Sequence, residues 1–563
     1  MNGDIAAPRV SGIGADDTAL GTAMAQRGHL TVLVGSLALA GFACDSGTSP
    51  PGAVSARTGS ESASDTSGAP SSTGSGGAGS SGNPASGAMS SAGSASLGDS
   101  MLSGSSASSG GASGGALSNG GSPSDAGTGA VDSDIAAIVA SVSSARLSQS
   151  IQTLVAFGTR SSCSTSTSNT QGIVPARDWI KAQFDAIGSL TTSLYTYTQT
   201  GCAQPFMRDD VVAVHPGMTQ PGRLIVVGGH YDSRTLSVSD GTSPAPGAND
   251  SGSQTAVVLE LARIFAGHSF DATLVFVAFA GEEQGLVGSK ALAQNIDAVV
   301  PHADVVAMLN CDIVGGDSTM NNATTLQQFR LYSPGTPREV NASLPDGTTD
   351  DTSPSRGLMR YVATWGSAYV PSMSIVPELR EDRPGRGGDH ESFIAAGFPG
   401  VRFIETIESP NAGTTASHEH SPNDLQMYVT PVYTARIAQV VASVAASLAR
   451  APAAPGSITA SGTAMAATLG WTAPSSGAVD HYVVAGRPVT ENFYHTRVGV
   501  DAGQASAVVT PTALGVDPAN PYFVSVAAVD AAGHESLFAY PEYRCDTSGC
   551  VVPTAALNIT ATN

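Results

Sequence analysis

The chain is poor in charged residues, and positively charged ones are especially scarce. Charged side chains make up 13% of the 563 residues, against about 25% in an ordinary soluble domain. The 25 Lys and Arg are outnumbered by 46 Asp and Glu, which gives a net charge of −21, and no cluster of basic residues occurs along the sequence. Because such a chain repels a phosphate backbone, the composition argues against nucleic acid as a partner.

Long apolar runs and cysteines are also few. No apolar run reaches the roughly 20 residues that cross a bilayer, which argues against an integral membrane protein. The spacing of the six cysteines does not match a cysteine zinc cluster and fits an exported protein with a few disulfides. We expect Cys545 to pair with Cys550 and Cys163 with Cys202, and Cys311 to be a buried free thiol.

The N-terminal region has the pattern of an export signal. A short basic start precedes an apolar stretch, residues 30–43, and small residues follow. The signal would begin at Met24, so residues 1–23, starting at Met1, form an upstream extension or a misassigned start. The segment that ends at Cys44 resembles a bacterial lipoprotein box, although Gly41 stands where a branched aliphatic residue is usual. Both a lipid anchor at Cys44 and ordinary signal cleavage stay open, and either one predicts a cell-envelope lipoprotein or a secreted protein.

The composition changes three times along the chain. After the N-terminal region 1–44, residues 45–133 consist mainly of Ser, Gly, Ala and Thr. They cannot bury enough apolar surface to offset chain entropy, so we expect a disordered linker. In residues 134–450 apolar runs alternate with helical patterns. In residues 457–563 the helical periodicity disappears, and short β-type runs are separated by turn residues. We therefore expect an α/β domain followed by a small all-β domain.

The α/β region has enough periodicity to predict its central elements. Strand-like runs and helical patterns alternate, which favours a mostly parallel sheet covered by helices on both faces. The predicted strands are residues 224–227, 273–280, 305–309 and 401–404. The predicted helices are residues 255–266, 286–296 and 431–448.

The last region resembles a fibronectin type III sandwich. The resemblance rests on the runs 469–474, 481–484 and 522–528, of which the last alternates apolar and outward-facing residues as a half-buried strand does. A generic β appendage remains the alternative. Such a domain could bind a surface, a polymer or substrate, or shield its neighbour.

Acidic residues and histidines stand where the predicted strands of the α/β region end. Each has an ordinary explanation when taken alone, such as a helix cap or a favourable charge at a helix start. In a parallel α/β sheet, however, ligands gather beyond the carboxyl ends of the strands, so these residues should converge on one site. They are His230, Asp232, Asp250, Glu282, Glu283, Asp312, His418 and His420.

These residues lie in motifs that resemble the M28 family of zinc aminopeptidases, the group of bacterial leucine aminopeptidases and aminopeptidase Y-like enzymes. The matching motifs are Gly-Gly-His230-Tyr-Asp232-Ser, Ala-Asn-Asp250-Ser-Gly, Ala-Gly-Glu282-Glu283-Gln-Gly, Met-Leu-Asn-Cys-Asp312, Gly388-Asp389-His390-Glu-Ser-Phe393 and Gly397-Phe-Pro399. The resemblance implies a zinc exopeptidase fold and two Zn²⁺ per chain.

The resemblance also implies a role for each residue. His230 and Asp312 would hold one zinc, Glu283 and His420 the other, and Asp250 would bridge the pair. A shared carboxylate suits two cations about 3.5–4 Å apart, since it offsets their repulsion. Glu282 would be the general base, and Asp232 would hydrogen-bond the far nitrogen of His230.

Two points depart from the family pattern. The last ligand could be His418 or His420, and the pattern His-Thr/Ser-x-x-Asp favours His420 because Ser421 and Asp424 follow it. Some relatives carry a tyrosine near this histidine that stabilises the oxyanion, whereas Glu419 precedes it here. The oxyanion donor is therefore left open.

The resulting hypothesis is an exported two-zinc aminopeptidase that acts on peptides. A glutaminyl cyclase of related fold would need only one zinc and would not require His230. A catalytically inactive protein that binds a surface through its β-sandwich would not require all five ligands. The M20 peptidases have a similar ligand set, but the interval from Asp312 to His420 is too short for their separate lid domain.

Overall fold

The computed structural model describes residues 131–334, 353–382, 386–408 and 418–553. The predicted export signal, Cys44 and nearly all of the predicted linker lie outside these residues.

Within the described residues, the α/β region is built on an eight-stranded sheet in the order β1-β2-β4-β3-β5-β8-β6-β7. The strands are β1 (Thr191–Gln199), β2 (Phe206–His215), β3 (Gln220–His230), β4 (Ala272–Phe279), β5 (Asp304–Cys311), β6 (Gln328–Tyr332), β7 (Ser374–Glu378) and β8 (Gly400–Glu405). The central strands β4, β3, β5 and β8 run parallel. Antiparallel pairs β1–β2, β2–β4 and β6–β8 flank them, so the sheet as a whole is mixed.

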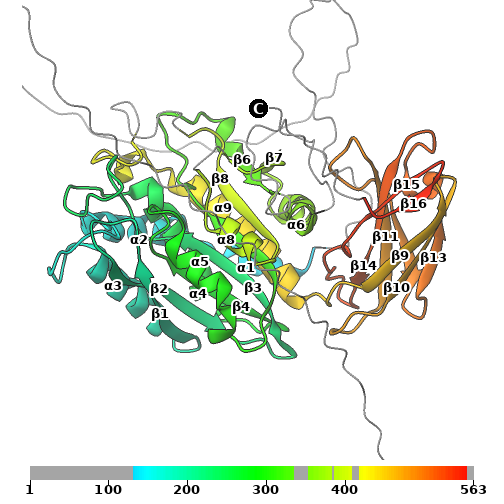
Figure 1. Ribbon diagram of the computed structural model, residues 1–563, viewed down its shortest axis with the longest axis horizontal. Helices are drawn as coiled ribbons and strands as arrows, with labels where there is room; N and C mark the ends of the chain where they lie inside the picture. The colour runs from blue at the N-terminus through cyan, green and yellow to red at the C-terminus, as the bar shows by residue number, and fades with distance from the viewer. Residues whose placement is uncertain (1–130, 335–352, 383–385, 409–417, 554–563) are drawn as a thin grey trace, which may run out of the picture. The chain divides into compact units, whose positions relative to one another are not determined.

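Helices cover both faces of this sheet, as predicted (Figure 1). Ile225 of β3 faces α1, α2, α3, α4 and α9 in one apolar core. Its neighbour Val226 faces α5 and α8 in a second core. Successive side chains of a strand point to opposite faces, so a strand buried on both sides reads as a continuous apolar run. The helices are α1 (Ser133–Ala140), α2 (Ser144–Ala156), α3 (Ile173–Asp185), α4 (Gln254–Phe265), α5 (Val287–Gln294), α6 (Pro354–Tyr361), α7 (Ser367–Tyr369), α8 (His390–Ala395) and α9 (Pro431–Arg450).

The outer strands of the sheet were not predicted. Strand β1 reads TTSLYTYTQ and alternates exposed with partly buried residues, so it lacks the apolar run that marks the centre of the sheet. Strand β2 contains Arg208, Asp209 and Asp210, which interrupt the apolar pattern of its first half. Strand β1 lies at the edge of the sheet and carries a weak apolar signal because it buries less of its surface. Strand β2 lies inside the sheet and is mostly buried, so its charged residues and not its exposure hid it.

Helix α9 qualifies the argument about membrane spans. Of the helices in the described residues, α9 has the length and apolarity of a membrane span, with a mean hydropathy of 1.4. However, 83% of that window is buried against the rest of the fold, and α9 packs on α1, α2 and strands β3 and β4. The buried core helix of a soluble protein meets the same criteria of length and apolarity, so these features of α9 are weak evidence for a membrane span.

The C-terminal region is all-β, as predicted. A three-stranded sheet (β13-β10-β9) and a five-stranded sheet (β12-β11-β14-β15-β16) are antiparallel throughout the described residues. Their shared core includes Trp471, Tyr482 and Val524. The strands are β9 (Gly456–Thr463), β10 (Ala466–Thr472), β11 (His481–Pro488), β12 (Arg497–Asp501), β13 (Ser506–Val509), β14 (Tyr522–Val529), β15 (Tyr543–Asp546) and β16 (Gly549–Val551), with the short helix α10 (Pro511–Leu514).

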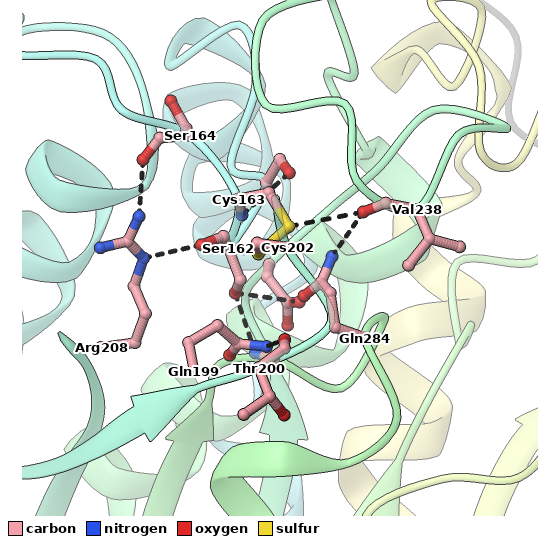
Figure 2. The surroundings of a disulfide bond; sticks show 12 residues. Ser162, Cys163, Ser164, Gln199, Thr200, Cys202, Arg208, Val238 and Gln284 are labelled. Carbon is pink, nitrogen blue, oxygen red and sulfur yellow. Dashed lines mark hydrogen bonds between the residues drawn. A yellow bond between two sulfur atoms is a disulfide. The ribbon is translucent and has the colours of Figure 1, made fainter. Parts of the chain in front are cut away.

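The predicted cysteine chemistry is confirmed. Cys163 pairs with Cys202 and Cys545 with Cys550, and Cys311 is a buried free thiol at the end of β5. The Cys163–Cys202 disulfide joins the loop after α2 to the loop after β1. Figure 2 shows its surroundings.

Candidate metal centre

The structure brings together the five side chains that the sequence nominated as metal ligands. They come from the end of β3, the turn before α4, the turn after β4, the residue after β5 and the loop before α9: His230, Asp250, Glu283, Asp312 and His420. Asp250 lies between the two histidines. Its Oδ1 is 3.3 Å from His230 Nε2, and its Oδ2 is 3.0 Å from His420 Nε2. One carboxylate therefore faces both imidazoles, each through a different oxygen.

On one side of Asp250, His230 and Asp312 face each other. His230 Nε2 lies 3.4 Å from Asp312 Oδ1, and the amide nitrogen of Gln254 lies 3.0 Å from the same ring nitrogen. The far nitrogen, Nδ1, lies 3.4 Å from Asp232 Oδ1 and 3.1 Å from the backbone oxygen of Asp232. A carboxylate at the far nitrogen fixes which nitrogen is free to bind a metal. The ring is thus oriented with Nε2 towards Asp250 and Asp312.

On the other side, Glu283 and His420 form the matching pair. Glu283 Oε2 lies 3.3 Å from His420 Nε2, and the Glu283 side chain is 4% exposed. Glu282 precedes Glu283 in the same turn and, like it, is partly exposed as a whole residue. Its backbone amide donates to Asp232 Oδ1 over 3.4 Å. The two adjacent glutamates therefore have different surroundings, and only Glu283 is paired with a histidine of the centre.

The structure separates the two candidates for the last ligand. His418 points away from the centre: its Nδ1 lies 2.6 Å from Asp317 Oδ2, and its ring stacks on Tyr428 at 3.7 Å between centroids. His420 faces Asp250 and Glu283. Asp424, four residues later, accepts hydrogen bonds from the backbone amides of residues 249 and 250 over 2.8 and 2.9 Å. The loop that carries His420 thus also holds the turn that carries Asp250.

Two arginines that sequence reasoning missed contact the predicted ligands. Arg402 Nε lies 2.9 Å from Asp312 Oδ2, and Arg234 Nε donates to Glu283 Oε2 over 2.6 Å. Arg402 is almost fully buried, and it also pairs with Asp382 at 3.0 Å. A signal was available, because Arg402 is a charged residue inside the otherwise apolar start of β8, GVRF. A lone buried charge of that kind needs a carboxylate partner.

The charges of the centre act strongly on one another. Burial raises the pKa of Asp250, but the charges of the nearby His230 and His420 hold it well below its ordinary value. Burial lowers the pKa of His420, whereas Glu283 and Asp250 raise it by more, to about 10. Burial also raises the pKa of Glu282 well above its ordinary value, although the charge of His230 opposes this. The buried carboxylates therefore favour positive charge in the space between them.

The donor set fits a metal centre. The ligand atoms of His230, Asp250 and Glu283 all lie within 4.8 Å of one another. Asp250 Oδ1 and Glu283 Oε1 are buried and lack a hydrogen-bond partner, which is costly for a carboxylate unless a cation satisfies it. Imidazole nitrogens and carboxylate oxygens are ligands that Zn²⁺ takes readily in proteins. The residues present are thus suited to hold zinc.

The two histidines allow a matched test of the last ligand. Replacing His420 with Ala is expected to remove one zinc and nearly all activity, since it takes away an imidazole that faces Asp250 and Glu283. Replacing His418 with Ala should leave the zinc content unchanged, because His418 contacts Asp317 instead. Zinc quantification of both purified variants checks this. Loss of zinc in the His418 variant alone would contradict the assignment.

Comparisons with known proteins identify the family of the chain. Residues 210–445 match the sequence model of peptidase family M28. A protein described as a probable zinc metalloprotease of Leptosphaeria maculans is 36% identical over 406 residues, which cover 68% of this chain and 92% of that relative. Among solved structures, the LapA aminopeptidase of Legionella pneumophila is 21% identical with a TM-score of 0.42, over 56% of this chain and 74% of that one. The glutaminyl cyclase of Porphyromonas gingivalis is 17% identical with a TM-score of 0.40, over 54% of this chain and 98% of that one. The chain belongs to peptidase family M28 and is a zinc metallopeptidase.

Proposed function

We propose that the protein is an aminopeptidase that binds two Zn²⁺ and removes N-terminal residues from peptides. The observation that carries the proposal is the position of Asp250, whose two oxygens face the imidazoles of His230 and His420 at 3.3 and 3.0 Å. A carboxylate shared in this way is what two neighbouring cations require. His230 with Asp312 would complete one zinc site, and His420 with Glu283 the other.

Zinc bound in this centre supplies Lewis-acid activation of a water molecule and of the scissile carbonyl. Glu282 acts as the general base: it accepts a proton from the attacking water and delivers it to the departing amine. The charges of His230, Asp312 and Glu283 act on its carboxylate, which therefore lies close to the proposed ligands. Asp232 holds the ring of His230 from its far nitrogen.

The main alternative is a glutaminyl cyclase with one zinc. A single zinc needs one half of the centre, so His230 and Asp312 would have no reason to face each other at 3.4 Å. Asp232 and Gln254 would likewise have no reason to orient the ring of His230. The completeness of both halves favours hydrolysis with two metals. The same completeness argues against a catalytically inactive protein that only binds a surface.

A variant of His230 tests the number of metals. Replacing His230 with Ala is expected to lower the zinc content from two per chain to one and to reduce hydrolysis of aminoacyl-anilides strongly. Elemental analysis measures the zinc, and a panel of aminoacyl-anilides with a glutamine substrate for cyclisation measures both activities. An unchanged zinc content, or a wild-type protein that cyclises glutamine and hydrolyses nothing, would refute the proposal.

We also propose that the enzyme is exported, as a lipoprotein anchored at Cys44 or as a secreted protein. The export-type pattern of residues 24–43 and the two disulfides support this. The all-β region is proposed to be a fibronectin type III-like domain that binds a surface or polymer. Mass spectrometry of the exported protein tests the anchor, because a lipidated Cys44 should be the N-terminal residue. An unmodified N-terminus elsewhere would exclude it.

A further inference from the structure

The turn that carries Glu282 is held by side chains from outside it. Three successive backbone amides of this turn each donate to a different side chain. Ala280 donates to Asp210 Oδ1 over 2.8 Å, Gly281 to Ser162 Oγ over 2.9 Å, and Glu282 to Asp232 Oδ1 over 3.4 Å. The backbone that carries Glu282 is thus held by groups that are not part of the turn.

Ser162 occupies a central place among these groups. It is fully buried, and its hydroxyl accepts from Gly281 while it donates to Asp232 Oδ2 over 3.3 Å. Asp232 in turn orients His230. A hydroxyl can donate one hydrogen bond and accept others at the same time. Ser162 therefore connects the turn of Glu282 to the residue that orients His230.

The position of Ser162 is itself fixed by a disulfide (Figure 2). Its neighbour Cys163 is bonded to Cys202. Arg208 of β2 donates to the backbone oxygen of Ser162 over 2.8 Å and to that of Ser164 over 2.6 Å. The disulfide therefore joins the loop of Ser162 to the loop that follows β1.

On its other side, the turn packs closely against Gln199. Gly281 has a φ of +72°, and a Cβ added there would lie 2.1 Å from Gln199 Oε1. Gln199 is the last residue of β1, three residues before Cys202. Both sides of the turn therefore depend on the segments that the disulfide joins. The Ser162 segment lies outside residues 210–445, which the family model matches.

We infer that Ser162 is a positioning residue for the general base, and that the Cys163–Cys202 disulfide keeps it in place. The inference rests on the proposed function, since it assigns Glu282 the role of the base. Ser162 acts through the Gly281 amide and Asp232, neither of which is one of the five proposed ligands. Removing its hydroxyl should impair the chemical step and leave zinc and substrate binding nearly intact.

The first test replaces Ser162 with Ala in the full-length enzyme. We expect kcat to fall about tenfold or more, because small misplacements of a catalytic group are costly, with KM within about twofold and two zincs retained. The matched control is Ser164→Ala, a buried serine in the same loop whose hydroxyl accepts from the backbone amide of Ser166 and does not contact the turn. A Ser162 variant whose kcat stays within threefold of wild type, or that loses zinc, would overturn the inference.

The second test opens the disulfide in the folded enzyme, with Ser162 intact and with Ser162→Ala. The starting protein carries Cys545→Ser and Cys550→Ser, so that only the Cys163–Cys202 bond is reducible among the described residues. A phosphine converts this bond to two thiols and is itself oxidised; dithiols are avoided because thiolates bind zinc. We expect kcat to fall as in Ser162→Ala, and reduction to add little in a protein that already carries Ser162→Ala. An unchanged kcat after complete reduction would overturn the role of the disulfide.

A third measurement separates this inference from the proposed function. Glu282→Gln is assayed beside Ser162→Ala. If Glu282→Gln stays active, the proposed function fails and the inference fails with it. If Glu282→Gln is inactive and Ser162→Ala behaves as wild type, only the inference fails.

Discussion

Replacing Glu282 with Gln is expected to lower kcat by about 10³-fold while two zinc ions remain bound. General acid–base groups contribute about 10²–10⁴-fold to catalysis, and Gln keeps the size of Glu but cannot accept the proton. Zinc should remain because the residues that face one another in the centre are His230, Asp250, Glu283, Asp312 and His420, without Glu282. Steady-state hydrolysis of an aminoacyl-anilide, with zinc quantification on the same sample, measures both effects.

A control for this variant lies in the same turn. Gln284 follows the two glutamates and donates to the backbone oxygen of Val238 over 3.2 Å, away from the two histidines. Gln284→Ala should therefore keep most of the activity and both metals. If Glu282→Gln retained near-normal kcat, Glu282 would not be the base. If it lost zinc instead, its role would be that of a ligand.

The centre of the fold could be predicted from sequence because its strands are buried on both faces. The predicted strands 224–227, 273–280, 305–309 and 401–404 correspond to β3, β4, β5 and β8. Their continuous apolar runs are typical of strands that are buried on both faces of a sheet. Strands β6 and β7 were missed, since each is five residues long and β7 is exposed or only partly buried along its length. The antiparallel direction of the outer strands depends on pairing partners, which no local pattern specifies.

The candidate centre was predictable for a different reason. His230 and Asp312 follow strands that neighbour each other in the sheet, so the topology of an α/β fold alone brings them close. Nothing local indicated Ser162, which reaches the centre through a loop after α2. Arg234 stands two residues after Asp232, yet its contact with Glu283 depends on a turn from another strand. Side chains that support a site from distant loops become visible only once the loops are placed.

Removing zinc is expected to abolish hydrolysis and to lower the thermal stability of the enzyme. Without metal, the carboxylates of Asp250, Glu283 and Asp312 remain buried together, and two of their oxygens lack any hydrogen-bond partner. A ligand present at 100 times its Kd stabilises the folded state by about 2.7 kcal/mol. Each kcal/mol corresponds to about 2–4 °C in Tm for a domain of 150–250 residues and to less in a larger one, so each zinc should contribute about 5 °C or less in the larger α/β region of this chain.

The experiment is best done on two proteins side by side. Wild type and Glu282→Gln are stripped with a chelator and followed by calorimetry, with zinc measured at each step. The Tm of both proteins should fall by the same amount, because Glu282 is a base and not a ligand in this scheme. Added zinc should restore Tm in both proteins and hydrolysis in wild type alone. Full activity in wild type from which the zinc has been removed would refute a zinc-dependent reaction.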